Sequence, residues 1–225
     1  MKLLLINSSG RTAGNTARVM DLLEQNFMKI ARETALDLTC ERISLTQLSL
    51  KPCIGCRACF DRGESSCPQQ DDLLMLYEKM READGYVIAS PIYVEDVNGI
   101  LKTMIDRMAF LCHRPALYGK SALLFTTSGI GSSRHALTTM TKGFGTWGIK
   151  TAATMQFSLG ALTAREEVAV RYEKKIQANR PQVFACTGAK SVSSVLLFLD
   201  RVHRPAGVVE QKDSRSRHGR LPLLA

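Results

Sequence analysis

The sequence predicts an α/β fold with a parallel sheet, because segments typical of buried strands alternate with segments typical of amphipathic helices. The chain has 225 residues, which suits one such domain. Its composition, with 45% hydrophobic and 23% charged residues, is that of a globular protein. Right-handed crossovers between successive strands then give a doubly wound sheet of five strands, with helices on both faces.

The first half of the chain predicts two strands and two helices. Residues 2–7 are an apolar run typical of a buried strand, and residues 15–32 place apolar side chains at helical spacing. Residues 36–43 alternate as a strand does, before a long loop that contains cysteines. Residues 71–82 again have helical spacing, and Asp71 is well placed to cap that helix. The apolar faces of the two helices are expected to be Val19, Leu22, Leu23, Phe27 and Ile30, and Leu73, Leu74, Tyr77 and Met80.

The second half of the chain continues the alternation. Residues 85–90 form a third predicted strand, and residues 98–110 place apolar side chains at helical spacing. Residues 120–128 are a fourth strand, and a Gly/Ser loop leads from it into a helix at residues 134–144. Residues 150–158 are the fifth strand. The inward side chains of the helix at 98–110 are expected to be Ile100, Leu101, Met104, Ile105 and Met108.

A fifth helix at residues 163–178 is expected to close a domain that covers residues 1–180. Residues 181–225 are then a basic C-terminal extension, in which residues 193–202 have the pattern of a short helix and the end is expected to be mobile. The net charge is +9, but residues 201–225 alone carry +4. A basic tail on a nearly balanced domain is typical of a solvated end, so we expect no nucleic-acid partner.

The apolar start of the chain, residues 1–6, is too short for the core of a signal peptide and is followed at once by polar residues. No segment approaches the roughly 18 apolar residues that a membrane span needs. We therefore expect a cytoplasmic protein without a membrane span. In that compartment the seven cysteines are expected to be thiols, metal ligands or redox groups rather than disulfides.

Residues 8–16, Ser-Ser-Gly-Arg-Thr-Ala-Gly-Asn-Thr, join the first strand to the first helix and have the chemistry of a phosphate site. Free N–H groups and the dipole at a helix N-terminus attract anions, and Arg11 adds a charge-assisted bond. The loop lacks the Gly-Lys-Ser/Thr ending of a P-loop. The alternative is a polar turn that Asn15 caps. The residues expected to line the phosphate site are Ser9, Arg11, Gly14, Asn15 and Thr16.

Three loops of this sequence resemble the NAD(P)H-dependent FMN reductase family, within residues 1–178. They are Ser9-Gly10-Arg11 with Gly14-Asn15-Thr16, Ser90-Pro91-Ile92-Tyr93 with Lys102 and Asp106-Arg107 on the next helix, and Thr127-Ser128-Gly129-Ile130-Gly131. The resemblance implies a flavodoxin-like sheet with strand order 2-1-3-4-5. In that order the loops after the first and third strands flank the switch point of the sheet, where FMN binds.

The same resemblance places the flavin ring at the second and third loops. The residues implied there are Pro91, Ile92, Tyr93, Thr127, Ser128 and Gly129. For Tyr93 the alternative is that the side chain simply packs at the base of its loop. No catalytic side chain is assigned, because FMN itself carries the reaction, and NAD(P)H is a possible co-substrate.

The cysteine loop, residues 51–70, contains the pattern C-x2-C-x2-C-x7-C. This compact spacing is typical of [4Fe–4S] sites, whereas structural zinc prefers two ligand pairs separated by a longer arm. The loop resembles that of the iron–sulfur flavoproteins, which implies a cluster on Cys53, Cys56, Cys59 and Cys67. Free or redox-active thiols and zinc are the alternatives, because cluster-free members of the family carry a similar stretch here. The scattered cysteines Cys40, Cys112 and Cys186 are expected to be small buried residues.

Together these features predict an FMN-dependent oxidoreductase or electron-transfer flavoprotein with a [4Fe–4S] cluster. Two alternatives are a cluster-free NAD(P)H-dependent FMN or quinone reductase and a non-catalytic flavin electron carrier or redox sensor. The resemblance also implies a homo-oligomer, a dimer or tetramer, in which a cluster faces the FMN of a neighbouring subunit. The electron donor is NAD(P)H or a ferredoxin-type protein.

Overall fold

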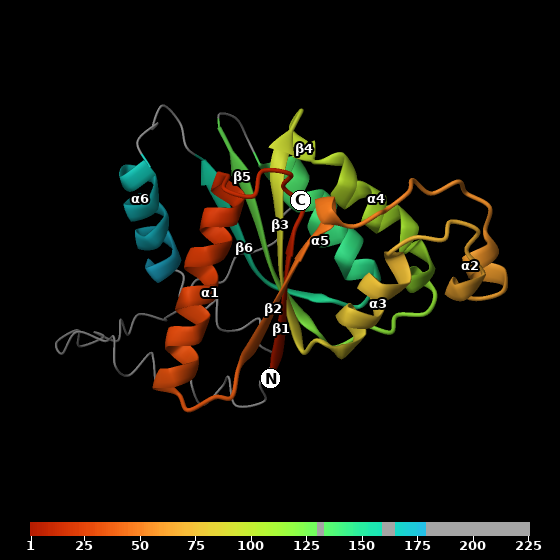
Figure 1. The fold of residues 1–225 in the computed structure, drawn as a ribbon, viewed down its shortest axis with the longest axis horizontal. Coiled ribbons are helices and arrows are strands. Elements are labelled where there is room, and N and C mark those ends of the chain that lie inside the picture. Colours follow the sequence, from red (N-terminus) through yellow and green to blue (C-terminus); the bar gives the residue numbers. More distant parts are fainter. Residues whose placement is uncertain (130–132, 159–164, 179–225) are drawn as a thin grey trace, which may run out of the picture.

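The computed structural model describes residues 1–129, 133–158 and 165–178. Its sheet has five parallel strands in the order β2-β1-β3-β5-β6, which confirms the expected flavodoxin-like order (Figure 1). A short extra strand, β4, pairs antiparallel with the end of β3. The strands are β1 Lys2–Asn7, β2 Thr39–Ser44, β3 Gly85–Tyr93, β4 Asp96–Val97, β5 Ser121–Ser128 and β6 Lys150–Ser158.

The helices follow the predicted order and cover both faces of the sheet. Helices α1 and α6 lie on one face, and α3, α4 and α5 lie on the other (Figure 1). The bounds are α1 Asn15–Glu33, α2 Ala58–Asp61, α3 Leu73–Glu82, α4 Gly99–Arg107, α5 Arg134–Thr146 and α6 Arg165–Ala178. Short 3-10 turns occupy Leu45–Gln47, Glu64–Ser66 and Ala109–Cys112. The helix expected at 98–110 is therefore shorter, because its last turn tightens into one of these.

Alternation along β1 explains the two layers of core. Leu3 and Leu5 are buried among the side chains of α1, whereas Leu4 and Ile6 are buried on the opposite face of the sheet. Successive strand residues point to opposite faces, so a strand covered on both sides is apolar throughout. This is why the opening run of the sequence is continuous rather than alternating.

The apolar faces predicted for α1 and α3 are largely confirmed. In α1 the expected side chains are buried except Leu22, which is half-buried. In α3, Leu76 is fully buried and was missed, while Leu74 is only half-buried. The residue that flanks α3 is Asp72 rather than Asp71, yet Oδ1 of Asp71 does accept the backbone N–H of Leu73 at 3.2 Å.

Strand β3 continues three residues beyond its predicted end at Ser90, and the register of the sheet gives the reason. Asn7, the last residue of β1, lies opposite Ala89, so Pro91 has a neighbouring strand only on the β5 side, where it faces Thr127. Proline lacks an N–H, which is tolerated where a strand has a free edge. The strand then turns back into β4.

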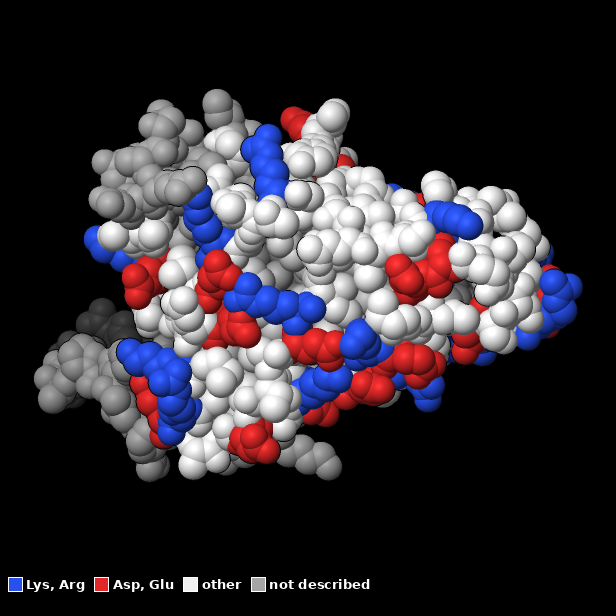
Figure 2. Space-filling model, in the orientation of Figure 1, with Lys and Arg blue, Asp and Glu red and all other residues white. Residues whose placement is uncertain are grey.

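Charged side chains at the exposed edge of the sheet pair with one another. Glu41 of β2 pairs with Lys2 and Lys79, and Arg42 pairs with Asp21 and Glu24. On the face shown in Figure 2, blue and red side chains are interspersed rather than gathered in one basic patch. Charged residues on an edge strand also discourage pairing with another sheet.

One prediction concerns residues that the structure does not describe. The C-terminal extension 181–225, with its short helix at 193–202, lies outside the described residues. Within the part that is described, no helix has both the length and the apolar character needed to cross a membrane.

Candidate functional site

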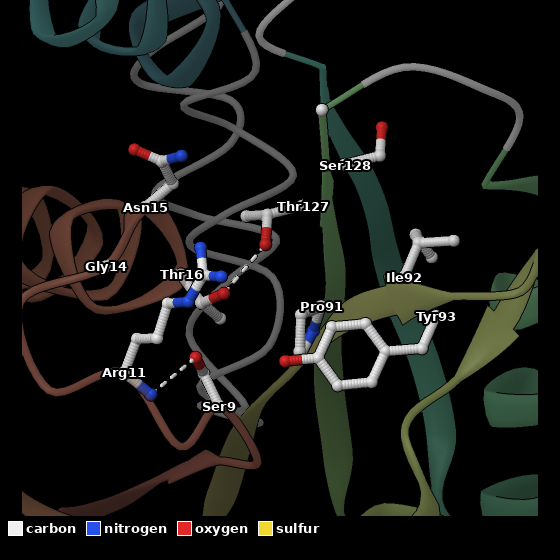
Figure 3. Close-up of a pocket in the computed structure, with 11 residues that line it drawn as sticks. Ser9, Arg11, Gly14, Asn15, Thr16, Pro91, Ile92, Tyr93, Thr127 and Ser128 are labelled. Atoms are coloured by element: carbon white, nitrogen blue, oxygen red, sulfur yellow. Dashed lines mark hydrogen bonds between the residues drawn. The ribbon is translucent and has the colours of Figure 1, made fainter.

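The carboxyl ends of β1, β3 and β5 bring three distant loops together. Because Pro91 lies opposite Thr127 and β1 ends beside β3, the loops that follow these strands meet at one edge of the sheet. There they enclose a cavity of about 180 Å³. Its lining is the set of residues predicted for FMN: Ser9, Arg11, Gly14, Asn15, Thr16, Pro91, Ile92, Tyr93, Thr127, Ser128 and Gly129 (Figure 3). Two further residues of the third loop, Ile130 and Gly131, lie outside the described residues.

The predicted phosphate loop, residues 8–16, is a tight turn that leaves the start of α1 without a side-chain cap. Ser9 Oγ accepts the N–H of Arg11 at 3.2 Å, and the N–H of Gly14 donates to the carbonyl of Arg11 at 3.1 Å. Helix α1 has no side-chain cap hydrogen bond and no acidic residue in its first turn. Asn15 is already inside the helix, so the alternative of a turn capped by Asn15 is wrong. Uncapped N–H groups without a nearby carboxylate are the requirement for an anion site.

Gly14 has a steric reason to be glycine. A Cβ at this position would lie 2.8 Å from Cβ of Arg11 and 3.2 Å from the Arg11 carbonyl oxygen. Next to it, the buried hydroxyls of Thr16 and Thr127 are 2.7 Å apart, which links α1 to the end of β5. The loop is therefore held close to the strand that carries the third part of the cavity.

On the other side of the cavity, Tyr93 lies on the β3–β4 hairpin and is 54% exposed. Packing at the base of its loop does not explain this position. In Figure 3 its hydroxyl is directed toward the side of the cavity that holds Arg11. The buried Ser128 Oγ has no hydrogen-bond partner among the described residues. A buried hydroxyl on a cavity wall is costly unless something bonds it, so it fits a polar ligand.

Asn98 is a residue that the sequence argument missed. Its side chain is buried and donates to the carbonyl of Ser8 at 2.6 Å, while its backbone N–H donates to Ser90 Oγ at 3.2 Å. It thereby ties the loop after β1 to strand β3. An asparagine directly before a helix usually caps that helix, and here the side chain makes no such bond. The sequence alone would therefore predict a helix cap at Asn98, and only the structure shows that its side chain bonds to Ser8 instead.

The four cysteines of the predicted cluster line a second cavity, together with Arg107 and Gln69 among others. Cys53 and Cys56 are exposed and Cys59 and Cys67 are half-buried, and all four are free. Left-handed backbone at Gly55 and Arg57 turns the chain between the first three. A set of four free thiols around one cavity fits the donor set of a [4Fe–4S] cluster. Among the described residues, no three Cys, His, Asp or Glu side chains are arranged to hold a single metal ion, so ligation stays a prediction.

The remaining cysteines differ from one another. Cys40 is half-buried, and burial raises the pKa of its thiol to about 11, with a further contribution from Glu24. Cys112 is exposed, so the expectation that it is buried is wrong. Cys186 lies outside the described residues.

A buried ion pair lies at the base of the cysteine loop. Arg107 and Asp71 are 2.5 Å apart, and each side chain is 1% exposed. Burial disfavours charge on Asp71, but hydrogen bonds from Arg107 and from the N–H groups of Lys51 and Leu73 outweigh it and lower its pKa. In the folded protein Asp71 is therefore ionised at neutral pH.

Replacement of Asp71 by Asn is expected to cost about 3–5 kcal/mol of stability near neutral pH, because Arg107 would stay buried without its partner. Since folding lowers the pKa of Asp71, this stability is present above the unfolded value of about 3.9 and is lost as the pH falls through the folded value. Urea unfolding at neutral and acidic pH measures the free energy of unfolding of both proteins. The difference between wild type and the Asn variant should narrow in acid, whereas the exposed Asp37→Asn control should differ from wild type by less than about 0.5 kcal/mol. A gap of constant size would contradict this prediction.

The sheet order and the cavity at its switch point, next to the start of α1, define a flavodoxin-like α/β protein. A sequence profile described as NADPH-dependent FMN reductase matches residues 1–164. The chain belongs to that family.

Named relatives agree with this assignment, and a solved structure shows the same fold. An iron–sulfur flavoprotein of Archaeoglobus fulgidus is 31% identical over 150 residues, which are 66% of this chain and 64% of that protein. One of Methanocaldococcus jannaschii is 39% identical over 107 residues, 48% of this chain and 51% of the relative. The chain thus spans about half to two thirds of the length of these relatives. The fold is similar to that of RosB, crystallised with bound 8-demethyl-8-formylriboflavin-5'-phosphate, with TM-score 0.61, 16% identity and coverage of 100% and 97% of the two chains.

Proposed function

We propose that this protein is an FMN-dependent oxidoreductase that carries a [4Fe–4S] cluster on its cysteine loop. The observation that carries the proposal is the cavity at the switch point of the sheet. Its lining combines a segment suited to the phosphate of FMN with two segments suited to the flavin ring. The names of the iron–sulfur flavoprotein relatives support the cluster. When bound, FMN supplies the exchange of two electrons with a hydride donor or of one electron with the cluster.

In this proposal the phosphate loop holds the terminal phosphate of FMN. The first N–H groups of α1 and the guanidinium of Arg11 bond its oxygens, and Thr16 adds a hydroxyl next to Thr127. Gly14 allows the backbone to approach the phosphate closely. These contacts are independent of redox state, so their role is to retain the cofactor.

The hairpin side of the cavity would hold the flavin ring. Pro91 and Ile92 offer an apolar wall, Tyr93 covers the exposed side, and Ser128 Oγ supplies a hydrogen bond to a polar edge. Cover on the exposed side limits access of water to the ring. The hydride donor we propose is NAD(P)H, in line with the family description.

Cys53, Cys56, Cys59 and Cys67 would hold the cluster, which supplies single-electron transfer. The cysteine loop projects from the body beside α3 and α4, away from the hairpin of β4 (Figure 1). The two cavities share no lining residue. This separation supports a homo-oligomer in which the cluster of one subunit serves the flavin of another. A ferredoxin-type protein is the second proposed donor, and a reducing cytoplasm suits the free thiols.

Anaerobic purification with FMN, iron and acid-labile sulfide counted per chain tests the proposal. We expect about one FMN and about four irons per chain, and loss of flavin absorbance when NADPH, NADH or a reduced ferredoxin is added. FMN without iron, but with reduction by NAD(P)H, would indicate the cluster-free reductase instead. FMN that none of these donors reduces would indicate a non-catalytic carrier, and a colourless protein that refuses FMN would rule out all three.

A further inference from the structure

We infer that Arg107 is a positioning residue for the iron–sulfur site, which fastens both ends of the cysteine loop and donates a hydrogen bond to the sulfur of Cys67. The inference rests on the proposed function, because it concerns a cluster bound by that loop. It adds a residue that is not a ligand and that lies on a helix, α4, outside the cysteine loop.

The guanidinium of Arg107 contacts both ends of the loop at once. Nη1 donates to the carbonyl of Lys51 at 2.6 Å, and Nη2 donates to the carbonyl of Gln69 at 3.3 Å. These residues stand at the start and near the end of the cysteine loop. The Arg107 guanidinium, held in the last turn of α4, therefore sets the distance between the two ends of the cysteine loop, next to Cys53 and Cys67.

Asp71 holds the guanidinium in this orientation. Its carboxylate accepts from Nη1 at 2.5 Å and from Nη2 at 3.1 Å, and it also accepts the N–H of Lys51 at 2.9 Å. A two-pronged pair of this kind depends on the flat fork of arginine, which lysine does not reproduce. Because both side chains are buried, the guanidinium keeps its orientation toward the cysteine loop.

The sulfur of Cys67 lies 3.6 Å from Nη2, within reach of an N–H···S hydrogen bond. Arg107 also lines the cavity shared by the four cysteines, and its buried Nε has no partner among the described residues. Reduction adds negative charge to a cluster, so a cationic donor on a ligand sulfur favours the reduced form. Arg107 is thus expected to raise the reduction potential as well as to place Cys67.

The double variant R107M/D71N tests this role, because it removes the cation and the carboxylate together and leaves the net charge unchanged. Iron and FMN are counted on wild type and variant, and the cluster is titrated electrochemically under EPR. Near the wild-type midpoint, the ratio of reduced to oxidised cluster should fall about tenfold, which is 59 mV for a one-electron couple. Arg32→Gln, an exposed change on α1, is the control and should leave the ratio unchanged.

Each result has a distinct meaning. Loss of iron from the double variant with full FMN content supports the positioning role, because Cys67 is then misplaced. If the double variant keeps full iron and the wild-type potential, the inference is overturned and the proposed function is intact. If the wild-type protein holds no iron, both the inference and the proposed cluster are overturned. If the double variant does not fold, Arg107→Lys replaces it: faster loss of iron to a chelator supports the role, and wild-type rate and potential overturn it.

Discussion

Replacement of any one of Cys53, Cys56, Cys59 or Cys67 by serine is expected to remove the iron and the visible absorption beyond that of the flavin. A [4Fe–4S] cluster uses four thiolates, and these four line one cavity. The cysteine loop has little apolar core of its own, with only Ala58 buried among residues 51–70, so nothing else would hold a cluster after one ligand is lost. Iron and sulfide analysis with the absorption spectrum measures the effect on anaerobically prepared protein.

The flavin provides the internal check for these cysteine variants, because its cavity shares no lining residue with the cysteine cavity. FMN content should therefore remain at the wild-type level. Cys112→Ser is the matched control, since Cys112 is an exposed free cysteine outside the loop. If all four variants keep their iron, the ligand assignment is wrong. If wild type never holds iron but releases zinc, the zinc alternative stands.

The cavity proposed for the flavin was predictable from sequence because its residues lie at the carboxyl ends of strands or in the loops that follow them. A parallel sheet places the carboxyl ends of its strands at one edge, so polar loops after the first, third and fourth long strands must meet there. The register shows this in Pro91 of β3, which pairs with Thr127 on the neighbouring strand β5. Local chemistry and strand order brought the first two loops together, whereas the resemblance to the FMN reductase family supplied the residues of the third, which lies more than a hundred residues from the first.

The extension of β3 to Tyr93 was less predictable, because a proline normally argues against a strand. It is tolerated here because β1 stops at Asn7, which lies opposite Ala89, two residues before Pro91. Asn98 shows the same limit, since its bond to the carbonyl of Ser8 joins residues 90 positions apart. Such contacts form only when the sheet is assembled, so no local sequence pattern predicts them.

The pair of Arg107 and Asp71 marks the limit most clearly. Asp71 has the local features of a helix cap, and Arg107 belongs to a short motif on the next helix, so neither residue alone indicates a buried charge. Only the tertiary fold brings them to 2.5 Å and seals both from water. The cysteine spacing predicted which thiols gather, while the residue that orders their loop came from the structure.

The double variant Arg11→Ala/Thr16→Val is expected to weaken FMN binding about a hundredfold. A charge-assisted bond contributes about 1.5–3 kcal/mol and a neutral hydroxyl bond about 1 kcal/mol, and each 1.4 kcal/mol is tenfold in Kd. Valine keeps the shape of the buried Thr16 side chain but cannot bond to Thr127 Oγ1. Fluorescence titration of the apoprotein with FMN measures the change.

Riboflavin, which lacks the phosphate, separates loss of the anion site from general damage to the cavity. Wild type should prefer FMN over riboflavin strongly. In the double variant this preference should fall about a hundredfold while riboflavin affinity stays the same, because the contacts removed are contacts to the phosphate. Lys29→Gln, an exposed change on the same helix, removes a positive charge and should keep the wild-type preference. If the double variant still prefers FMN as wild type does, the phosphate lies elsewhere. Equal losses for both ligands would instead place the effect on the ring side, where Pro91 and Tyr93 line the cavity.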